Sequence, residues 1–180
     1  VRLNEMPFVL PIALGRAEEI RRPFAPAELA TALATHEAAD GTGAAVLPPG
    51  YVDAVGRLGF DAVHGHLSGF VDMVCRVGDR WYIVDWKSNR LGSTWADYTP
   101  QRIAGAMAHH HYFLQYHLYT VAVHRYLQRR VPGYRYAESF GGVFYLFVRG
   151  MHPALGPRCG VFFDRPTEER IARLEAVLEG

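Results

Sequence analysis

A short stretch near the middle of the chain, Ile83 to Asn89 (IVDWKSN), places a carboxylate and an amine two residues apart. Side chains alternate across a β-strand, so Asp85 and Lys87 would share one face of a sheet. A second carboxylate, Asp72, lies thirteen residues before Asp85 in the apolar stretch GFVDMV. Burying an unpaired carboxylate is costly. The three side chains therefore predict a bound divalent cation, and oxygen ligands of this kind suit Mg²⁺ or Mn²⁺.

Lys87 is the one lysine of the chain, because lysines and arginines total 19 and the other 18 are arginines. An ammonium group is a compact point charge, whereas a guanidinium is planar, forked and permanently charged. A site that keeps lysine therefore indicates a role that needs a single point charge. The alternative is an internal ion pair of Lys87 with Asp72, with Asp85 capping a turn. Buried pairs stabilise weakly and need another reason to be kept.

Length and composition indicate one soluble domain, since the chain has 180 residues and 49% hydrophobic content. No apolar run approaches a membrane span of roughly 18 residues, and no signal peptide opens the chain, so we expect a cytoplasmic protein. The two cysteines, Cys75 and Cys159, are too few for a disulfide framework. A sequence that begins VRLNEMPF, without methionine, indicates a piece excised from a longer chain.

The net charge of +1 does not demand a nucleic-acid partner. Contacts to nucleic acid would have to come from local basic clusters. The alternative for such clusters is a set of solvated charges at helix ends. The candidate cluster, for which both interpretations stay open, comprises Arg125, Arg129, Arg130 and Arg135.

The elements that must position these residues begin with a β-hairpin, formed by strands at 64–77 and 81–88 around the turn GDR. The other predicted elements are an edge strand at Glu5–Ile12, a helix at 26–38, a loop at 89–99, a helix from Pro100, a helix at 111–130, strands at 140–150 and 159–165, and a helix at Thr167–Leu178. Residues 16–60 are interpreted as a peripheral insertion. This order predicts a three-layer domain with a mixed sheet.

The series GFVD, VDWKS and QYHLY resembles the PD-(D/E)XK nuclease superfamily, and most of all the nuclease domain at the C-terminus of RecB helicase-nuclease subunits. EMPF near the start and FGGVFYLFVRGM near the end extend the resemblance over most of the chain except 16–60. It implies an α/β fold: a restriction-endonuclease-like three-layer core with a central mixed β-sheet flanked by helices. Residues 1–180 would form a single nuclease domain.

The resemblance assigns roles to residues of the hairpin. Asp72 and Asp85 would bind the catalytic metal, with the backbone carbonyl of Trp86 as a third ligand. Lys87 would orient the attacking water and stabilise developing negative charge. Mg²⁺ is the implied cofactor, with Mn²⁺ as its substitute.

Further roles fall on the helix at 111–130 and on histidines. Gln115 and Tyr119 match the family's QxxxY motif and, four residues apart, project from one helix face to support the site and the DNA strand. Core packing is the alternative for Tyr119. The family also has a metal-binding histidine on a helix before the EMPF-like strand, which this sequence does not include. His36 is a poor substitute, whereas His64 and His66, which precede the hairpin, could approach the metal. Without the upstream histidine, the isolated chain is expected to bind metal weakly or be inactive.

The function implied is that of a Mg²⁺-dependent deoxyribonuclease, an exodeoxyribonuclease of the RecBCD type that hydrolyses phosphodiester bonds during processing of double-strand DNA ends for recombinational repair. Its partners would be single- and double-stranded DNA ends and other subunits of a RecBCD-like complex, without a membrane. The alternative is a catalytically silent docking module for partner subunits or inhibitory proteins. Glu5 is either an additional active-site carboxylate or an exposed strand charge.

Overall fold

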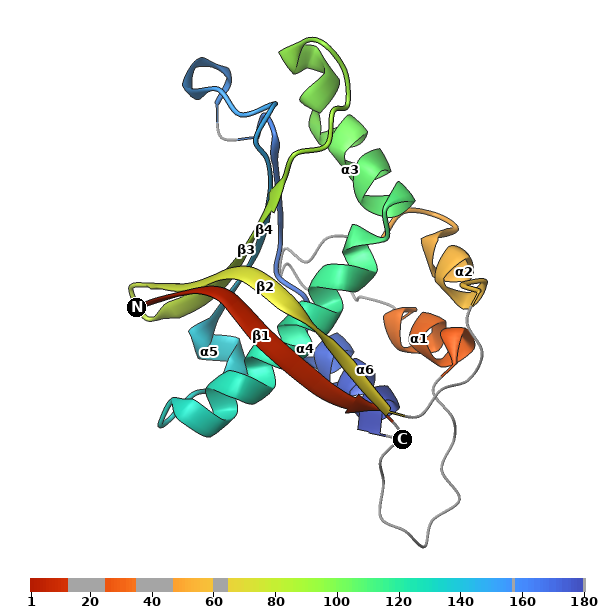
Figure 1. The fold of residues 1–180 in the computed structure, drawn as a ribbon, viewed down its shortest axis with the longest axis vertical. Helices are drawn as coiled ribbons and strands as arrows, with labels where there is room; N and C mark the ends of the chain where they lie inside the picture. The colour runs from red at the N-terminus through yellow and green to blue at the C-terminus, as the bar shows by residue number, and fades with distance from the viewer. Residues whose placement is uncertain (13–24, 35–46, 60–64, 157, 180) are drawn as a thin grey trace, which may run out of the picture.

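The computed structural model describes residues 1–12, 25–34, 47–59, 65–156 and 158–179. Its centre is a five-stranded sheet in the order β1-β2-β3-β4-β5, drawn in Figure 1. The first three strands form an antiparallel meander, β4 runs parallel to β3, and β5 is antiparallel to β4. This sheet, packed against helices, confirms the predicted mixed α/β class. The strands are β1 (Arg2–Ile12), β2 (Gly65–Val77), β3 (Arg80–Lys87), β4 (Phe140–Phe147) and β5 (Val161–Asp164).

The predicted hairpin of β2 and β3 is confirmed. Val77 pairs with Arg80, so the connection is a two-residue turn. Gly78 opens that turn with φ 59°, a left-handed conformation that glycine adopts without steric cost. The hairpin carries Asp72 and Asp85 on neighbouring strands.

β1 lies at the edge of the sheet, as its prolines predict. It pairs only with β2, and Pro7 and Pro11 stand opposite Phe70 and His66. Proline lacks the N–H that a second neighbouring strand would need, so it is tolerated at a sheet edge.

A long central helix, α4 (Tyr112–Arg130), crosses behind the β1–β2 pair and carries ten buried side chains. It supplies the helical wall of the site, and α6 (Glu168–Glu179) packs beside it (Figure 1). Pro100 starts α3 (Pro100–His109), where its missing N–H has no helical partner to lose. No helix of the described residues is long and apolar enough to cross a membrane.

Two short helices were not predicted, α2 (Tyr51–Gly56) and α5 (Tyr136–Ser139), because four to six residues show too little periodicity. α1 (Pro26–Leu33) is shorter than the predicted 26–38, whose last residues lie outside the described part. The described parts of 16–60 contribute to the core. Tyr51 is buried, and its hydroxyl accepts a hydrogen bond from the Leu114 N–H at 3.0 Å. The extent of the domain stays a prediction.

Candidate active site

The site lies where β2 and β3 separate. Their last paired residues are Met73 and Val84. In an antiparallel register the next positions are Asp72 and Asp85, so the two carboxylates come from opposite strands at the fork. Like charges directly opposite each other destabilise a sheet. The fork therefore brings together two acids that need a compensating positive charge.

Asp72 binds the backbone of β3 across this fork. Its Oδ2 accepts a hydrogen bond from the Trp86 N–H at 2.9 Å. The next carbonyl, that of Lys87, accepts from the Val148 N–H on the β4 side. Because strand backbone groups alternate in direction, the N–H and the carbonyl of Trp86 both face the β2 side. The Trp86 carbonyl thus faces the fork that holds Asp72.

Asp85 is a buried carboxylate, with 3% of its side chain exposed. Burial raises the pKa of Asp85 above its usual value; Lys87 acts to lower it, and the charge of Asp72 raises it further. The Lys87 Nζ lies 2.6 Å from Asp85 Oδ1 as an ion pair. This ion pair engages Oδ1, so Lys87 offsets the charge of one of the two acids at the fork.

Lys87 ends β3 with its ammonium group enclosed. The side chain is 11% exposed, and Nζ donates a hydrogen bond to Gln115 Oε1 at 3.0 Å. Nζ also lies 3.9 Å from the ring centroid of Tyr112 and 4.9 Å from that of Tyr145. Such contacts attract a cation to the face of an aromatic ring. The amine is thus held in one position beside Asp85.

The predicted pair on α4 meets this lysine. Gln115 Oε1 also accepts from the Tyr145 hydroxyl at 2.9 Å, and Gln115 Nε2 donates to the Tyr119 hydroxyl at 3.0 Å. Burial and the charges of the two aspartates raise the pKa of Tyr119 to about 12, so its hydroxyl stays protonated near neutral pH. The structure therefore joins Gln115 and Tyr119 to Lys87 in one network.

Tyr112 and Tyr145 were missed by sequence reasoning. Tyr145 stands directly opposite Asp85 in the β3–β4 register, and that pairing joins strands far apart in the chain. The sequence feature that marked Tyr145 was its hydroxyl group within the otherwise apolar stretch FGGVFYLF. Tyr112 lies three residues before Gln115, on the helix that already carried the QxxxY spacing.

Glu5 lies near the fork without joining it. It is exposed and has φ 47°, which is uncommon for a residue with a Cβ. Its β1 neighbours pair on either side of Asp72, so Glu5 stands at the register position of Asp72. No cluster of three or more His, Cys, Asp or Glu side chains forms within the described residues. Two carboxylates therefore make up the acidic part of the site.

Of the three histidines considered as metal ligands, only His66 lies within the described residues, and it is not brought to the fork. His36 and His64 lie outside the described residues. His66 is exposed and lies six positions from Asp72 along β2, which corresponds to roughly 20 Å at the rise of a strand.

The donor set fits a hard divalent cation. Mg²⁺ takes one or two protein carboxylates and completes its coordination with water and phosphate oxygens. The fork offers the carboxylates of Asp72 and Asp85, and the Trp86 carbonyl faces the same side of β3. Lys87 offsets the charge of one acid, so a bound cation would neutralise the remaining negative charge.

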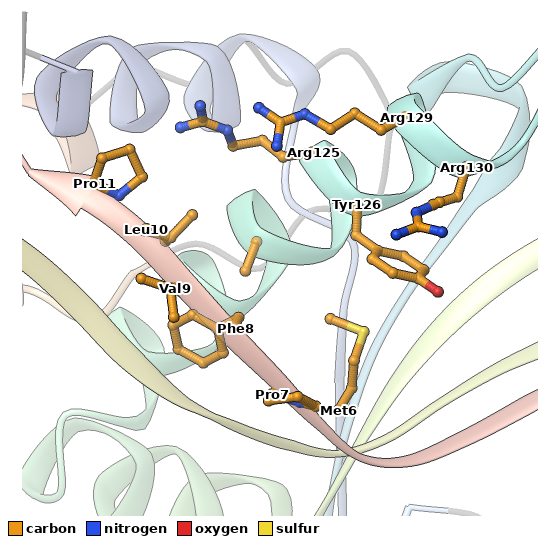
Figure 2. Close-up of a pocket in the computed structure, with 11 residues that line it drawn as sticks. Met6, Pro7, Phe8, Val9, Leu10, Pro11, Arg125, Tyr126, Arg129 and Arg130 are labelled. Carbon is orange, nitrogen blue, oxygen red and sulfur yellow. The ribbon is translucent and has the colours of Figure 1, made fainter.

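Two of the four arginines of the predicted basic cluster, Arg125 and Arg135, are paired with acids. Figure 2 shows a groove between β1 and α4 in which Arg125 and Arg129 extend toward α6, whereas Arg130 turns toward Tyr126. Arg125 lies 3.4 Å from Glu175 and 3.2 Å from Glu179. Outside the groove, Arg135 pairs with Glu138 at 2.7 Å. This "α4 groove", lined by residues 6–11 and by Ala122, Arg125, Tyr126, Arg129 and Arg130, therefore holds one arginine that is paired with acids, Arg125, and two exposed arginines that form no ion pair with a described residue.

Comparison with known proteins adds two findings. Residues 12–179 match the family model of the PD-(D/E)XK nuclease superfamily. The chain is 51% identical over 120 residues to the RecBCD enzyme subunit RecB of Haemophilus influenzae, which covers 67% of this chain and 10% of that protein. It is 46% identical over 123 residues to RecB of Escherichia coli, covering 68% of the chain and 10% of that protein. It is 38% identical over 186 aligned residues to RecB of Mycobacterium tuberculosis, covering 99% of the chain and 16% of that protein.

Proposed function

The chain belongs to the PD-(D/E)XK nuclease superfamily, and from this premise we propose that it is the metal-dependent DNA nuclease domain of a RecB-type helicase-nuclease. The observation that carries the proposal is the fork of β2 and β3, where Asp72 and Asp85 approach each other beside the enclosed Lys87. A purely structural ion pair would account for one of these acids but not for both.

Asp72, Asp85 and the Trp86 carbonyl would hold a divalent cation, Mg²⁺ or Mn²⁺. When bound, such an ion polarises a phosphodiester and lowers the pKa of water in its shell. Neutralisation of two opposed carboxylates would also stabilise the fork, since burial and mutual repulsion both disfavour the charged form of Asp85.

Lys87 would supply fixed positive charge where negative charge develops on the phosphate oxygens. Such fixed charge accelerates reactions because it does not need to reorganise during the step. Its ammonium group can give one hydrogen to a water molecule and another to a phosphate oxygen. Gln115 acts as a positioning residue: it holds Nζ, and the Tyr119 and Tyr145 hydroxyls fix its amide in turn. A guanidinium in this enclosure would present a broad fork in place of a point charge.

The biological setting rests on the relatives. All three cited relatives are RecB subunits of RecBCD enzymes, and the chain spans only 10% to 16% of their length. We propose that the chain cuts single- and double-stranded DNA ends during recombinational repair in the cytoplasm, as part of a complex with further subunits. The motor that delivers the DNA would belong to other parts of that complex.

The test is cleavage of linear and circular single-stranded DNA and of linear duplex DNA with Mg²⁺, Mn²⁺ or EDTA. The protein is compared with Lys87→Ala and with Arg173→Ala, which removes an exposed arginine of α6. Metal-dependent cutting that is lost in Lys87→Ala and kept in Arg173→Ala supports the proposal. A folded protein that cuts no substrate, even with the subunits of its own complex present, would favour a docking role.

A further inference from the structure

The connections that follow β3 and β4 lie at the same end of the sheet because these two strands are parallel neighbours. Figure 1 shows both connections at the upper end of the molecule. The first connection, residues 88–99, begins directly after Lys87, and the second is 148–160. Whatever binds between them therefore lies next to the proposed active site.

The two connections are tied together. The Gly160 N–H donates to the Tyr98 carbonyl at 3.2 Å, and the Arg149 Nε donates to the Ser88 carbonyl at 2.9 Å. Tyr98 is 3% exposed, and its hydroxyl accepts from the Leu91 N–H at 3.3 Å. These bonds hold both segments in one shape, and a preformed site loses less entropy on binding.

Between them lies an open cleft of about 620 Å³, within the size range of ligand sites. We call it the loop cleft. The lining residues that matter are Arg90, Ser93, Trp95, Tyr98 and Arg149.

The charge of the loop cleft is positive and unmatched. Arg90 and Arg149 are both exposed, and no carboxylate of a described residue lies within ion-pair distance of either. Arg90 Nη2 donates to Ser93 Oγ at 2.9 Å, which fixes one edge of its guanidinium. Asp97, the acid of the first connection, is engaged by Arg102 at 2.7 Å. In the α4 groove, by contrast, Arg125 is paired with Glu175 and Glu179.

The same cleft carries an exposed aromatic surface. Trp95 is 50% exposed, and its ring centroid lies 4.6 Å from that of His152 in the opposite connection. Aromatic rings beside arginines bind single-stranded nucleic acid, since bases stack on the rings and phosphates pair with the cations. An acidic peptide would use the two arginines but would have no need of the indole.

Building on the proposed nuclease function, we propose that the loop cleft is a single-stranded DNA subsite adjoining the cleavage point. Arg90 and Arg149 bind phosphates of the nucleotides next to the bond held at Lys87, and Trp95 stacks on one of their bases. The subsite fixes the strand on one side of the cut. It therefore governs how far from a DNA end the enzyme cleaves.

The test is binding of a fluorescent oligothymidylate to the protein in EDTA, measured by anisotropy at several salt concentrations. Arg90→Ala is expected to lower the slope of log K against log salt by about 1. Trp95→Ala is expected to weaken binding roughly 5- to 100-fold, as loss of one stacked base does. Arg173→Ala, which removes an exposed arginine of α6, is the arginine control and should bind like the unaltered protein. Thermal unfolding of each variant verifies its fold, and Arg149→Lys tests the second arginine with its charge kept.

A second arm identifies the occupant. The unaltered protein should bind an oligonucleotide with abasic positions more weakly than the intact oligonucleotide. Trp95→Ala should bind the two oligonucleotides equally, because this variant has already lost the stacking contact. Binding by Arg90→Ala and Trp95→Ala equal to that of Arg173→Ala would overturn the proposal. So would displacement of the DNA by polyglutamate at equal charge concentration. EDTA prevents cleavage, so binding and cutting are measured separately. Binding that depends on Arg90 and Trp95, without any cutting in Mg²⁺, would contradict the nuclease proposal but not the subsite. Cutting in Mg²⁺ with binding that does not depend on these residues would contradict the subsite but not the nuclease proposal.

Discussion

Replacement of Gln115 by leucine tests whether the enclosed lysine depends on its helix partner. The substitution removes three hydrogen bonds: from Lys87 at 3.0 Å, from Tyr145 at 2.9 Å and to Tyr119 at 3.0 Å. The bond from the charged amine contributes roughly 1.5–3 kcal/mol, and each neutral bond roughly 0.5–1.5 kcal/mol. Added apolar burial of leucine offsets about 1 kcal/mol. The free energy of unfolding should fall by roughly 1.5–5 kcal/mol.

Activity should fall as well, because the ammonium loses the group that fixes its position. A displacement of about 1 Å at a catalytic group can cost roughly 100-fold in rate. Urea unfolding gives the first quantity, and single-turnover DNA cleavage in Mg²⁺ gives the second. Gln128→Leu is the matched control, since Gln128 is an exposed glutamine of the same helix. The reasoning is refuted if both leucine variants unfold at the same urea concentration and cleave at the same rate.

Two further predictions concern stability. Complete burial lowers the pKa of His117 to about 3. Below about pH 6.5 the unfolded chain therefore takes up a proton that the folded chain does not, so the free energy of unfolding decreases as the pH is lowered. His117→Leu should remove roughly 2–3 kcal/mol of the loss between pH 6.5 and 4.5 in urea titrations, and an unchanged acid loss would count against this assignment. A Cβ at Gly142, which has φ 131°, would lie 2.6 Å from the Asp164 carbonyl oxygen, so Gly142→Ala should cost at least about 2 kcal/mol. Gly105→Ala, which meets nothing within 4 Å in α3, should stabilise by about 0.5–1 kcal/mol, and thermal unfolding that ranks the two glycine variants equally would contradict this.

The sequence predicted the parts of the fold that local patterns specify. Alternation and a tight turn indicated the β2–β3 hairpin, and the spacing of Gln115 and Tyr119 indicated one face of α4. The fork itself could not be predicted, because strand separation after Met73 and Val84 depends on how β1 and β2 bend over α4. The loop cleft was not predicted either, because it forms between two connections that are far apart in the sequence.

Long-range pairing also hid part of the lysine enclosure. Tyr145 reaches the site only because β4 pairs with β3 in parallel, across a connection of more than fifty residues. A parallel partner cannot be identified from local turn signals. By contrast, the acids on the hairpin were identifiable because charge within an apolar strand needs a reason.

The central claim is that the fork holds a divalent cation and that Lys87 acts on the substrate, and Mn²⁺ binding followed by electron paramagnetic resonance tests it most directly. Asp72→Asn and Asp85→Asn should each weaken saturable Mn²⁺ binding. Lys87→Ala should keep or tighten it while losing cleavage, because its ammonium lies 2.6 Å from Asp85 Oδ1 and competes with the metal. Mn²⁺ binding that is the same in the unaltered protein and in both asparagine variants would contradict the account.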